Sequence, residues 1–147
     1  MSLSRRTILK SVSGVLALAL PSAVLAKWPQ TAFESKNVEA VLKNLYSESE
    51  AIESSDITIK VPAIAENGRF VPVEIETTLA KVESISIISE INPVPLLGEF
   101  KFADNVLPWI KTRVKISKTG NVIVMVKTNN QLYTARKQIT VNLSGCV

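Results

Sequence analysis

The chain has 147 residues, a formal net charge of +4, a single cysteine and no histidine. A length of this order suits one domain. Without histidine the chain lacks the commonest general base and metal ligand, and one cysteine cannot build a zinc cluster, so neither a metal site nor a cofactor of its own is expected.

Residues 1–26 predict an export signal that is removed from the mature protein. The paired Arg5 and Arg6 resemble a twin-arginine signal, and the apolar run 15–20 is too short to span a bilayer. Small residues up to Ala26 complete the pattern of a cleavable signal. Cleavage there would leave 14 basic against 13 acidic residues, a balance that argues against nucleic-acid or membrane-surface binding. The sequence thus predicts a protein of the bacterial periplasm.

An amphipathic helix is predicted within residues 27–55, the N-terminal helical segment. Its apolar side chains recur at a spacing of three or four residues, so they share one face of a helix from about residue 37 to 47. Ser35 or Asn37 could serve as its N-cap. We expect this helix to cover one end of a sheet rather than to dock a partner. The apolar positions are Val38, Val41, Leu42 and Leu45.

From residue 56 to 142 the period of the apolar residues changes to two, as in half-buried strands. Turn dipeptides such as Asn67-Gly68 and Gly120-Asn121 separate the runs. No helical pattern lies between them, so the predicted fold class is mainly β, an immunoglobulin-like antiparallel β-sandwich of about seven strands. The likeness is architectural, because the Cys-Trp-Cys core of antibody domains is absent. The predicted strands are about 57–61, 71–77, 82–91, 97–102, 110–116, 122–126 and 132–143.

Charged residues alternate with apolar ones on two of these strands. Glu74 and Glu76 lie on a strand face that is most simply solvated. Lys111, Arg113 and Lys115 form a basic stripe, for which ordinary exposed sheet is the simpler interpretation. A dock for anionic or acidic partners is the alternative.

The last five residues, 143–147, are predicted to form a flexible carrier arm, because terminal residues fray unless something ties them down. Cys146 is the only thiol of the chain. Gly145 has no side chain and Ser144 is small, so both leave the backbone freedom. From Leu143 to Cys146 the chain can extend about 10 Å, enough to place the sulfur in a narrow channel of a partner.

Nothing in the local sequence activates the thiol of Cys146. The carboxylate of Val147 disfavours the thiolate, because like charges repel, and no basic residue follows Lys137. A partner would therefore have to activate the sulfur, which favours a passive attachment point over a self-activating nucleophile. From the residues alone, the alternative is a terminal thiol without a role, or one that only forms an intermolecular disulfide.

Three segments and the C-terminus resemble the SoxY family, the sulfur-carrier subunits of the bacterial Sox thiosulfate-oxidising system. The likeness covers the signal and nearly the whole mature chain. The tail Ser144-Gly145-Cys146-Val147 is similar to the family's Gly-Gly-Cys-Gly ending, with serine for the first glycine and valine for the last. The segments are Ala65-Glu66-Asn67-Gly68-Arg69-Phe70-Val71-Pro72-Val73, Asn92-Pro93-Val94-Pro95-Leu96 and Leu132-Tyr133-Thr134-Ala135-Arg136-Lys137.

The resemblance implies a carrier rather than an enzyme. SoxY-like proteins have an immunoglobulin-like sandwich and form a heterodimer with SoxZ. Their cysteine, here Cys146, receives thiosulfate through the SoxXA c-type cytochrome, and the dimanganese hydrolase SoxB then releases sulfate and leaves a persulfide. Metal and haem would belong to these partners. The main rival is a periplasmic binding module that uses Cys146 only for a disulfide-linked dimer, and a weaker rival is a thiol enzyme acting alone.

Overall fold

The computed structural model describes residues 29–47, 50–129 and 131–142. The predicted signal, 1–26, and the predicted arm, 143–147, lie outside these residues. The described part begins with two helices, α2 (Gln30–Phe33) and α3 (Val38–Tyr46), and continues through strands to the end of β9. No helix in these ranges is long and apolar enough to cross a membrane.

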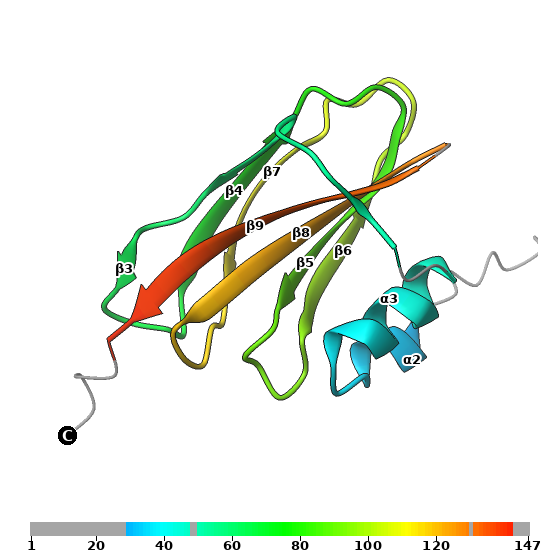
Figure 1. The fold of residues 1–147 in the computed structure, drawn as a ribbon. Coiled ribbons are helices and arrows are strands. Elements are labelled where there is room, and N and C mark those ends of the chain that lie inside the picture. The colour runs from blue at the N-terminus through cyan, green and yellow to red at the C-terminus, as the bar shows by residue number, and fades with distance from the viewer. Residues whose placement is uncertain (1–28, 48–49, 130, 143–147) are drawn as a thin grey trace, which may run out of the picture.

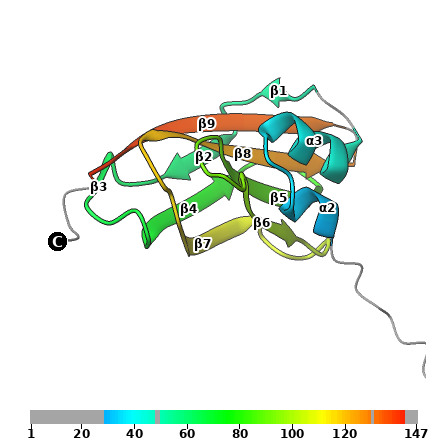
Figure 2. The same cartoon turned by 90° about the horizontal axis from the view of Figure 1, so that it is seen from below.

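The strands form two sheets that face each other, and the helices lie at one end (Figure 1). In the larger sheet the order is β1-β9-β8-β5-β6, with β3 also paired to β9, and in the smaller sheet it is β2-β4-β7. The view from below shows the smaller sheet beneath the larger one (Figure 2). The strands are β1 (Ile52–Glu53), β2 (Ile57–Lys60), β3 (Ile64–Ala65), β4 (Val71–Thr77), β5 (Val82–Ser89), β6 (Leu96–Lys101), β7 (Trp109–Val114), β8 (Gly120–Thr128) and β9 (Leu132–Val141).

The main core lies between the two sheets and is built by the alternation seen in the sequence. On β4, Val73 and Ile75 are buried, whereas Pro72 between such positions is exposed, because successive side chains of a strand point to opposite faces. The core is almost wholly β-branched and aliphatic, which suits a pleated, buried surface. Its fully buried members include Val71, Val73, Ile75, Ile85, Ile87, Val122, Val124, Val126 and Ile139.

A second core joins the helices to the other face of the larger sheet. Ile123 and Met125 of β8 belong to it, and they alternate with the residues of the main core on the same strand. The hydroxyls of Tyr46 and Ser86 form a hydrogen bond of 2.6 Å in this core. The Asn37 side chain caps α3 by accepting the backbone N–H of Ala40 at 2.8 Å. The helix therefore covers one end of the sheet, as its apolar face predicted.

The fold class predicted from the sequence is confirmed. The structure contains the predicted helix and all seven predicted strands, and the long strands pair antiparallel. Three short elements were not predicted: α2 and the two-residue strands β1 and β3. Both short strands pair parallel with β9, so β9 is bonded on both sides. That pairing fixes the end of β9, the last described strand before Cys146.

Candidate functional site

The predicted attachment residue Cys146 and its neighbours Ser144, Gly145 and Val147 lie outside the described residues. The structure ends at Asn142, one residue beyond β9. The described part of the site is therefore the surface around Asn142, from which the chain continues to the cysteine. We call this surface the arm base and define it as the segments 64–70, 115–119 and 140–142.

The strand β3 fixes the end of β9 from one side. Thr140 donates its backbone N–H to the carbonyl of Ala63 at 3.0 Å, and Asn142 donates to the carbonyl of Ala65, also at 3.0 Å. Ala65 is buried, with 6% of its surface exposed. The hydrogen bonds thus continue to the last described residue, so the tail starts from a fixed point.

Thr119 and Gly68 also hold Val141. The backbone N–H of Val141 donates to the Thr119 hydroxyl at 2.9 Å. Gly68 packs so closely here that a Cβ on it would lie 2.9 Å from Cγ1 of Val141 and would overlap the carbonyl oxygen of Ile116. The Gly68 carbonyl accepts the N–H of Ile116 at 2.7 Å. Glycine is required because only a residue without a side chain allows this approach.

Asn92 ties the segment 115–117 to the rest of the molecule. Its side-chain amide donates to the carbonyl of Lys115 at 2.7 Å. Its side-chain oxygen accepts both the N–H of Ser117 at 2.9 Å and the Ser117 hydroxyl at 3.0 Å. The half-buried Asn92 side chain thus takes part in three hydrogen bonds. These bonds link the two loops, which have no strand pairing between them. The segments 65–73 and 92–96, singled out in the sequence, therefore both contact the loop 115–117.

The outer surface of the arm base carries two exposed apolar side chains. Ile64 of β3 is 59% exposed, and Phe70, which precedes β4, is 67% exposed. The charged residues of the defined segments are also exposed, and three of them are basic against one acidic: Arg69, Lys115, Lys118 and Glu66. Ile64 belongs to the larger sheet and Phe70 adjoins the smaller one, and single exposed apolar side chains are common on protein surfaces.

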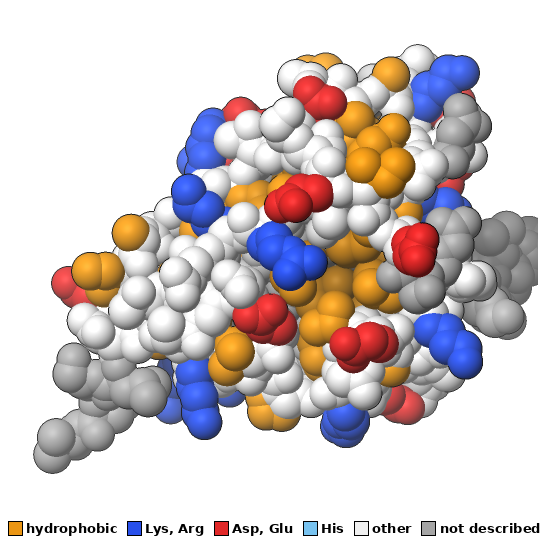
Figure 3. Space-filling view, in the orientation of Figure 1, with side chains coloured by type: hydrophobic (Ala, Val, Ile, Leu, Met, Phe, Trp, Pro, Cys, Tyr) orange, Lys and Arg blue, Asp and Glu red, His pale blue; other side chains and the backbone are white. Residues whose placement is uncertain are grey.

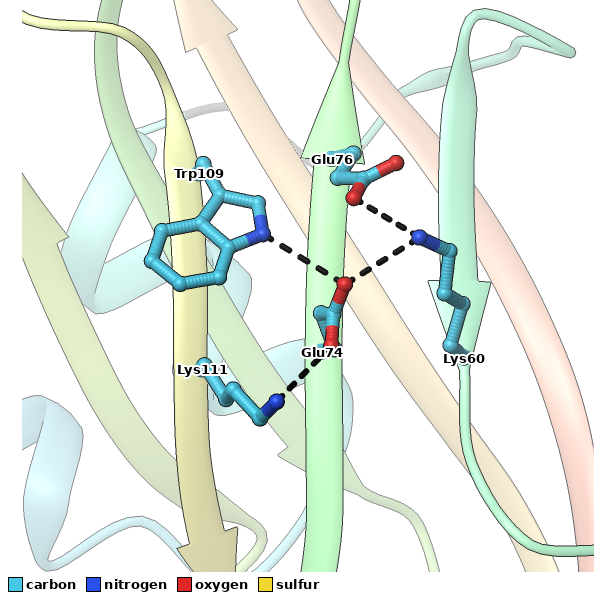
Figure 4. A network of polar contacts seen from close by, with 5 residues as sticks. All are labelled: Lys60, Glu74, Glu76, Trp109 and Lys111. Carbon is cyan, nitrogen blue, oxygen red and sulfur yellow. Dashed lines mark hydrogen bonds and ion pairs between the residues drawn. The ribbon is translucent and has the colours of Figure 1, made fainter.

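The outer face of the smaller sheet carries a network of charges (Figure 4). Lys60 contacts Glu74 at 3.1 Å and Glu76 at 2.7 Å, and Lys111 lies 3.6 Å from Glu74. The indole N–H of Trp109 donates to Glu74 at 3.5 Å. The hydrogen bonds that Lys60 donates to Glu76 and Glu74 raise the pKa of Lys60, and the bond that Glu74 accepts from Lys60 lowers the pKa of Glu74. The charges of these side chains are therefore paired within the network itself.

A hollow lies between α3 and the larger sheet, and hydrophobic side chains line it between charged ones (Figure 3). Its volume is about 390 Å³. Thr134, which lines it, lies eight residues before Asn142 on the same strand, about 26 Å away at 3.3 Å per residue. The hollow is therefore not part of the arm base. Among its other lining residues are Val38, Leu42, Ala51, Met125 and Arg136.

No group of three or more histidine, cysteine or carboxylate side chains that could hold a metal ion occurs in the described ranges. The arm base therefore supplies position and no metal-binding group: its hydrogen bonds hold residues 140–142, from which the tail continues. The sequence predicted a turn at Asn67-Gly68 and left residues 92–96 between two predicted strands, 82–91 and 97–102. Nothing in the neighbouring sequence indicates that Gly68 and Asn92 form hydrogen bonds to the distant segment 115–117.

The sequence model of the family described as "Sulfur oxidation protein SoxY" matches residues 42–146. Among solved structures, the sulfur carrier protein SoxY from Chlorobium limicola f thiosulfatophilum is 32% identical, with a TM-score of 0.64 over 69% of this chain and 93% of that chain. The superoxide reductase (neelaredoxin) from Ignicoccus hospitalis is 21% identical, with a TM-score of 0.52 over 58% and 80% of the two chains, and shares the fold alone. No curated protein gives a significant match. The chain belongs to the SoxY family of sulfur oxidation proteins.

Proposed function

We propose that this chain is a periplasmic sulfur carrier that holds thiosulfate-derived sulfur covalently on Cys146. The observation that supports this most directly is the extent of the family match, which runs to residue 146 and so includes the only cysteine of the chain. A carrier needs one accessible sulfur and no catalytic group of its own. Export by the twin-arginine pathway, with the signal in residues 1–26, belongs to the same proposal.

The chemistry has two steps. In the first, the Sγ of Cys146 bonds to the outer sulfur of thiosulfate, and one proton and two electrons are released. A c-type cytochrome of the SoxXA type accepts the electrons. In the second, a SoxB-type hydrolase adds water to the terminal sulfonate, so that sulfate leaves and a persulfide remains on Cys146. The carrier supplies only the attached sulfur and its position.

The residues around the cysteine have physical roles in this scheme. Gly145 and Ser144 keep the chain narrow before the sulfur, and Val147 follows it. The body keeps the start of the tail fixed, through the hydrogen bonds of Thr140, Val141 and Asn142. We include a SoxZ-like subunit as the heterodimer partner, because carriers of this family pair with one.

Mass spectrometry of the protein purified from cells oxidising thiosulfate tests the proposal. We expect sulfonate or sulfane adducts on Cys146, and thiosulfate oxidation should stop in a Cys146→Ser variant. A Ser144→Cys/Cys146→Ser variant is the matched control, since it keeps one thiol but shortens its reach by about 7 Å. It should react with a small alkylating reagent as the wild type does, yet accept little sulfur from the partners.

The opposite result identifies the rival function. If Cys146 carries no adduct and the Cys146→Ser variant oxidises thiosulfate normally, the chain is not a carrier. A disulfide-linked dimer seen only on non-reducing gels of the wild type would then identify a binding module that uses its odd cysteine for pairing.

A further inference from the structure

We propose that Arg113 and Lys115, on the outer face of the smaller sheet, bind the sulfonate group that Cys146 carries after it is loaded. The occupant of this site is the chain's own C-terminal segment, 143–147, in its loaded form, and not another protein. This inference rests on the proposed carrier function and adds a place where the loaded group is held by the carrier itself.

The register of β7 divides its basic stripe into a paired and an unpaired part. Lys111 lies opposite Glu74 and forms an ion pair of 3.6 Å with it (Figure 4). Arg113 lies opposite Pro72, which carries no charge. Neither Arg113 nor Lys115 forms an ion pair with another described residue. The end of the stripe that lies toward the arm base is therefore free to bind an anion.

Arg113 and Lys115 share one face of the sheet, because successive side chains of an extended chain alternate. Val114 and Ile116 belong to the main core, so the residues next to them are turned outward, and both cations are exposed. Their Cα atoms lie about 7 Å apart along the strand, so both side chains can reach the oxygens of one sulfonate. The guanidinium can donate two hydrogen bonds to such a group, and the ammonium adds a point charge.

The fold brings these cations within reach of the tail. Ile116 donates its N–H to Gly68, and Gly68 also packs on Val141. Neighbouring backbone segments lie about 5 Å apart, so roughly 10 Å separates Ile116 from Val141. Cys146 follows Asn142 by four residues, so its sulfur can lie up to about 14 Å from the end of the described chain. A sulfonate attached to that sulfur can therefore reach the side chains beside Ile116.

Attachment to the chain allows a weak anion site to be occupied. Exposed cations bind a free anion weakly, because water and salt screen the charges. An anion on a short tether instead has an effective concentration in the millimolar range. Glu66 is the one acidic residue of the arm base, and Arg69 and Lys118 add two positive charges to the same segments, so the local field also favours an anion. The loaded group is anionic, whereas the thiol is mostly neutral at pH 7. The contact therefore depends on loading.

The test uses the full mature chain with its sulfur loaded chemically, so no partner protein is needed. The Cys146 thiolate attacks a central sulfur of tetrathionate. A bond forms between Sγ and that sulfur, thiosulfate leaves, and an S–S–SO3⁻ group remains without any other oxidant. A second sample is alkylated with iodoacetamide, which places a neutral group on the same sulfur. Amide NMR spectra of both samples are compared with those of the unmodified protein.

We expect the charged adduct to shift the amide signals of Arg113 and Lys115, and the relaxation of the Cys146 amide to approach that of the folded body. The neutral adduct should cause neither change. Both changes should be present at an ionic strength of about 0.01 M, where the Debye length is about 30 Å, and lost at about 1 M, where it is about 3 Å. In an Arg113→Gln/Lys115→Gln variant, the relaxation of the Cys146 amide should be the same for the two adducts.

Lys101→Gln is the matched control, because it also removes one exposed positive charge. Lys101 pairs with Ser84, which pairs with Lys127, which pairs with Leu132 at the start of β9. The tail leaves from the other end of β9, about 30 Å away. Lys101→Gln should therefore respond to loading as the wild type does.

Equal responses of the wild type to the charged and the neutral adduct would overturn this inference. A response to the charged adduct that persists in the Arg113→Gln/Lys115→Gln variant, or that is lost in Lys101→Gln, would also overturn it. These results would leave the carrier function intact, since that function is decided by the adducts that form on Cys146 in cells. A Cys146 without such adducts would count against the carrier function whatever the spectra show.

Discussion

Gly68 and Ile116 are joined by a hydrogen bond of 2.7 Å at a point where the two backbones leave no room for a side chain. Val141 packs on the same glycine. The bond therefore connects the turn that precedes β4, the loop that follows β7 and the end of β9. Three segments far apart in the sequence are fixed relative to one another within the arm base.

A Gly68→Ala substitution should destabilise the protein although it adds a single methyl group. The new Cβ would overlap the Ile116 carbonyl oxygen, which is backbone and cannot rotate away. Overpacking of this kind costs about 1–3 kcal/mol. The free energy of unfolding from urea denaturation measures the loss. Gly98→Ala is the control, since its Cβ would meet only the ring of Phe100 at 3.2 Å, and an equal loss in both variants would contradict the steric explanation.

An Asn92→Ala substitution should loosen the loop 115–117. It removes three hydrogen bonds and leaves the Ser117 N–H and the Lys115 carbonyl without their partner. We expect a loss of about 1–3 kcal/mol in the free energy of unfolding. Asn105→Ala, in an exposed turn, should change stability by no more than about 0.5 kcal/mol. Similar values for the two variants would show that the bridge contributes nothing.

A Thr119→Val substitution should act locally at the end of β9. It keeps the shape of the side chain but removes the oxygen that accepts the Val141 N–H at 2.9 Å. Hydrogen exchange at the Val141 amide should become faster, whereas exchange in the middle of β9 should not change. Thr58→Val on β2 is the control. Uniform acceleration along β9 would instead indicate global destabilisation.

Tyr46 makes stability depend on pH in the alkaline range. Burial raises its pKa to about 12 from an ordinary value of 10.0. The folded chain therefore keeps this proton when the unfolded chain has lost it, so the free energy of unfolding falls as pH rises above 10. The fall contributed by Tyr46 should be about 2 kcal/mol at pH 12, because half of the folded chains still hold the proton there.

Comparison with Tyr46→Phe isolates this contribution. At neutral pH the variant should be less stable by about 1–3 kcal/mol, because the Ser86 hydroxyl loses its partner at 2.6 Å. Above pH 10 the difference between the two proteins should shrink. Tyr46→Phe/Ser86→Ala should regain part of the loss at neutral pH. A difference that stays constant from about pH 9 to 11 would contradict the assignment.

The long elements could be predicted from the sequence because their signals are local. Helical spacing over 37–47 and alternation along each long strand depend only on neighbours in the chain. The strands β1 and β3 have two residues each, too few to show a period, and they exist because β9 offers unpaired backbone groups. Helix α2 is a single short turn with Ala32 buried in the helical core. Such elements follow from tertiary contacts.

The candidate site divides in the same way. Composition and the family resemblance identified Cys146 as the predicted attachment site for sulfur, and this role stays a prediction. The domain boundaries after residues 26, 55 and 142 also stay predictions. The arm base could not be predicted, since Asn92 and Ser117 are 25 residues apart and meet only in the folded chain. An asparagine between strands and a glycine in a turn have the same local sequence pattern whether or not they bond to a distant loop.

The position of β9 has a mechanical consequence. It is bonded to β8 along one edge and to β1 and β3 along the other, and the chain runs on from its end to the cysteine. The interstrand hydrogen bonds of β9 run across the strand. A force applied along the strand through residue 142 therefore shears all of these bonds at once and does not break them one after another. Under the proposed carrier function, a partner that pulls on the segment after Asn142 would leave β9 paired.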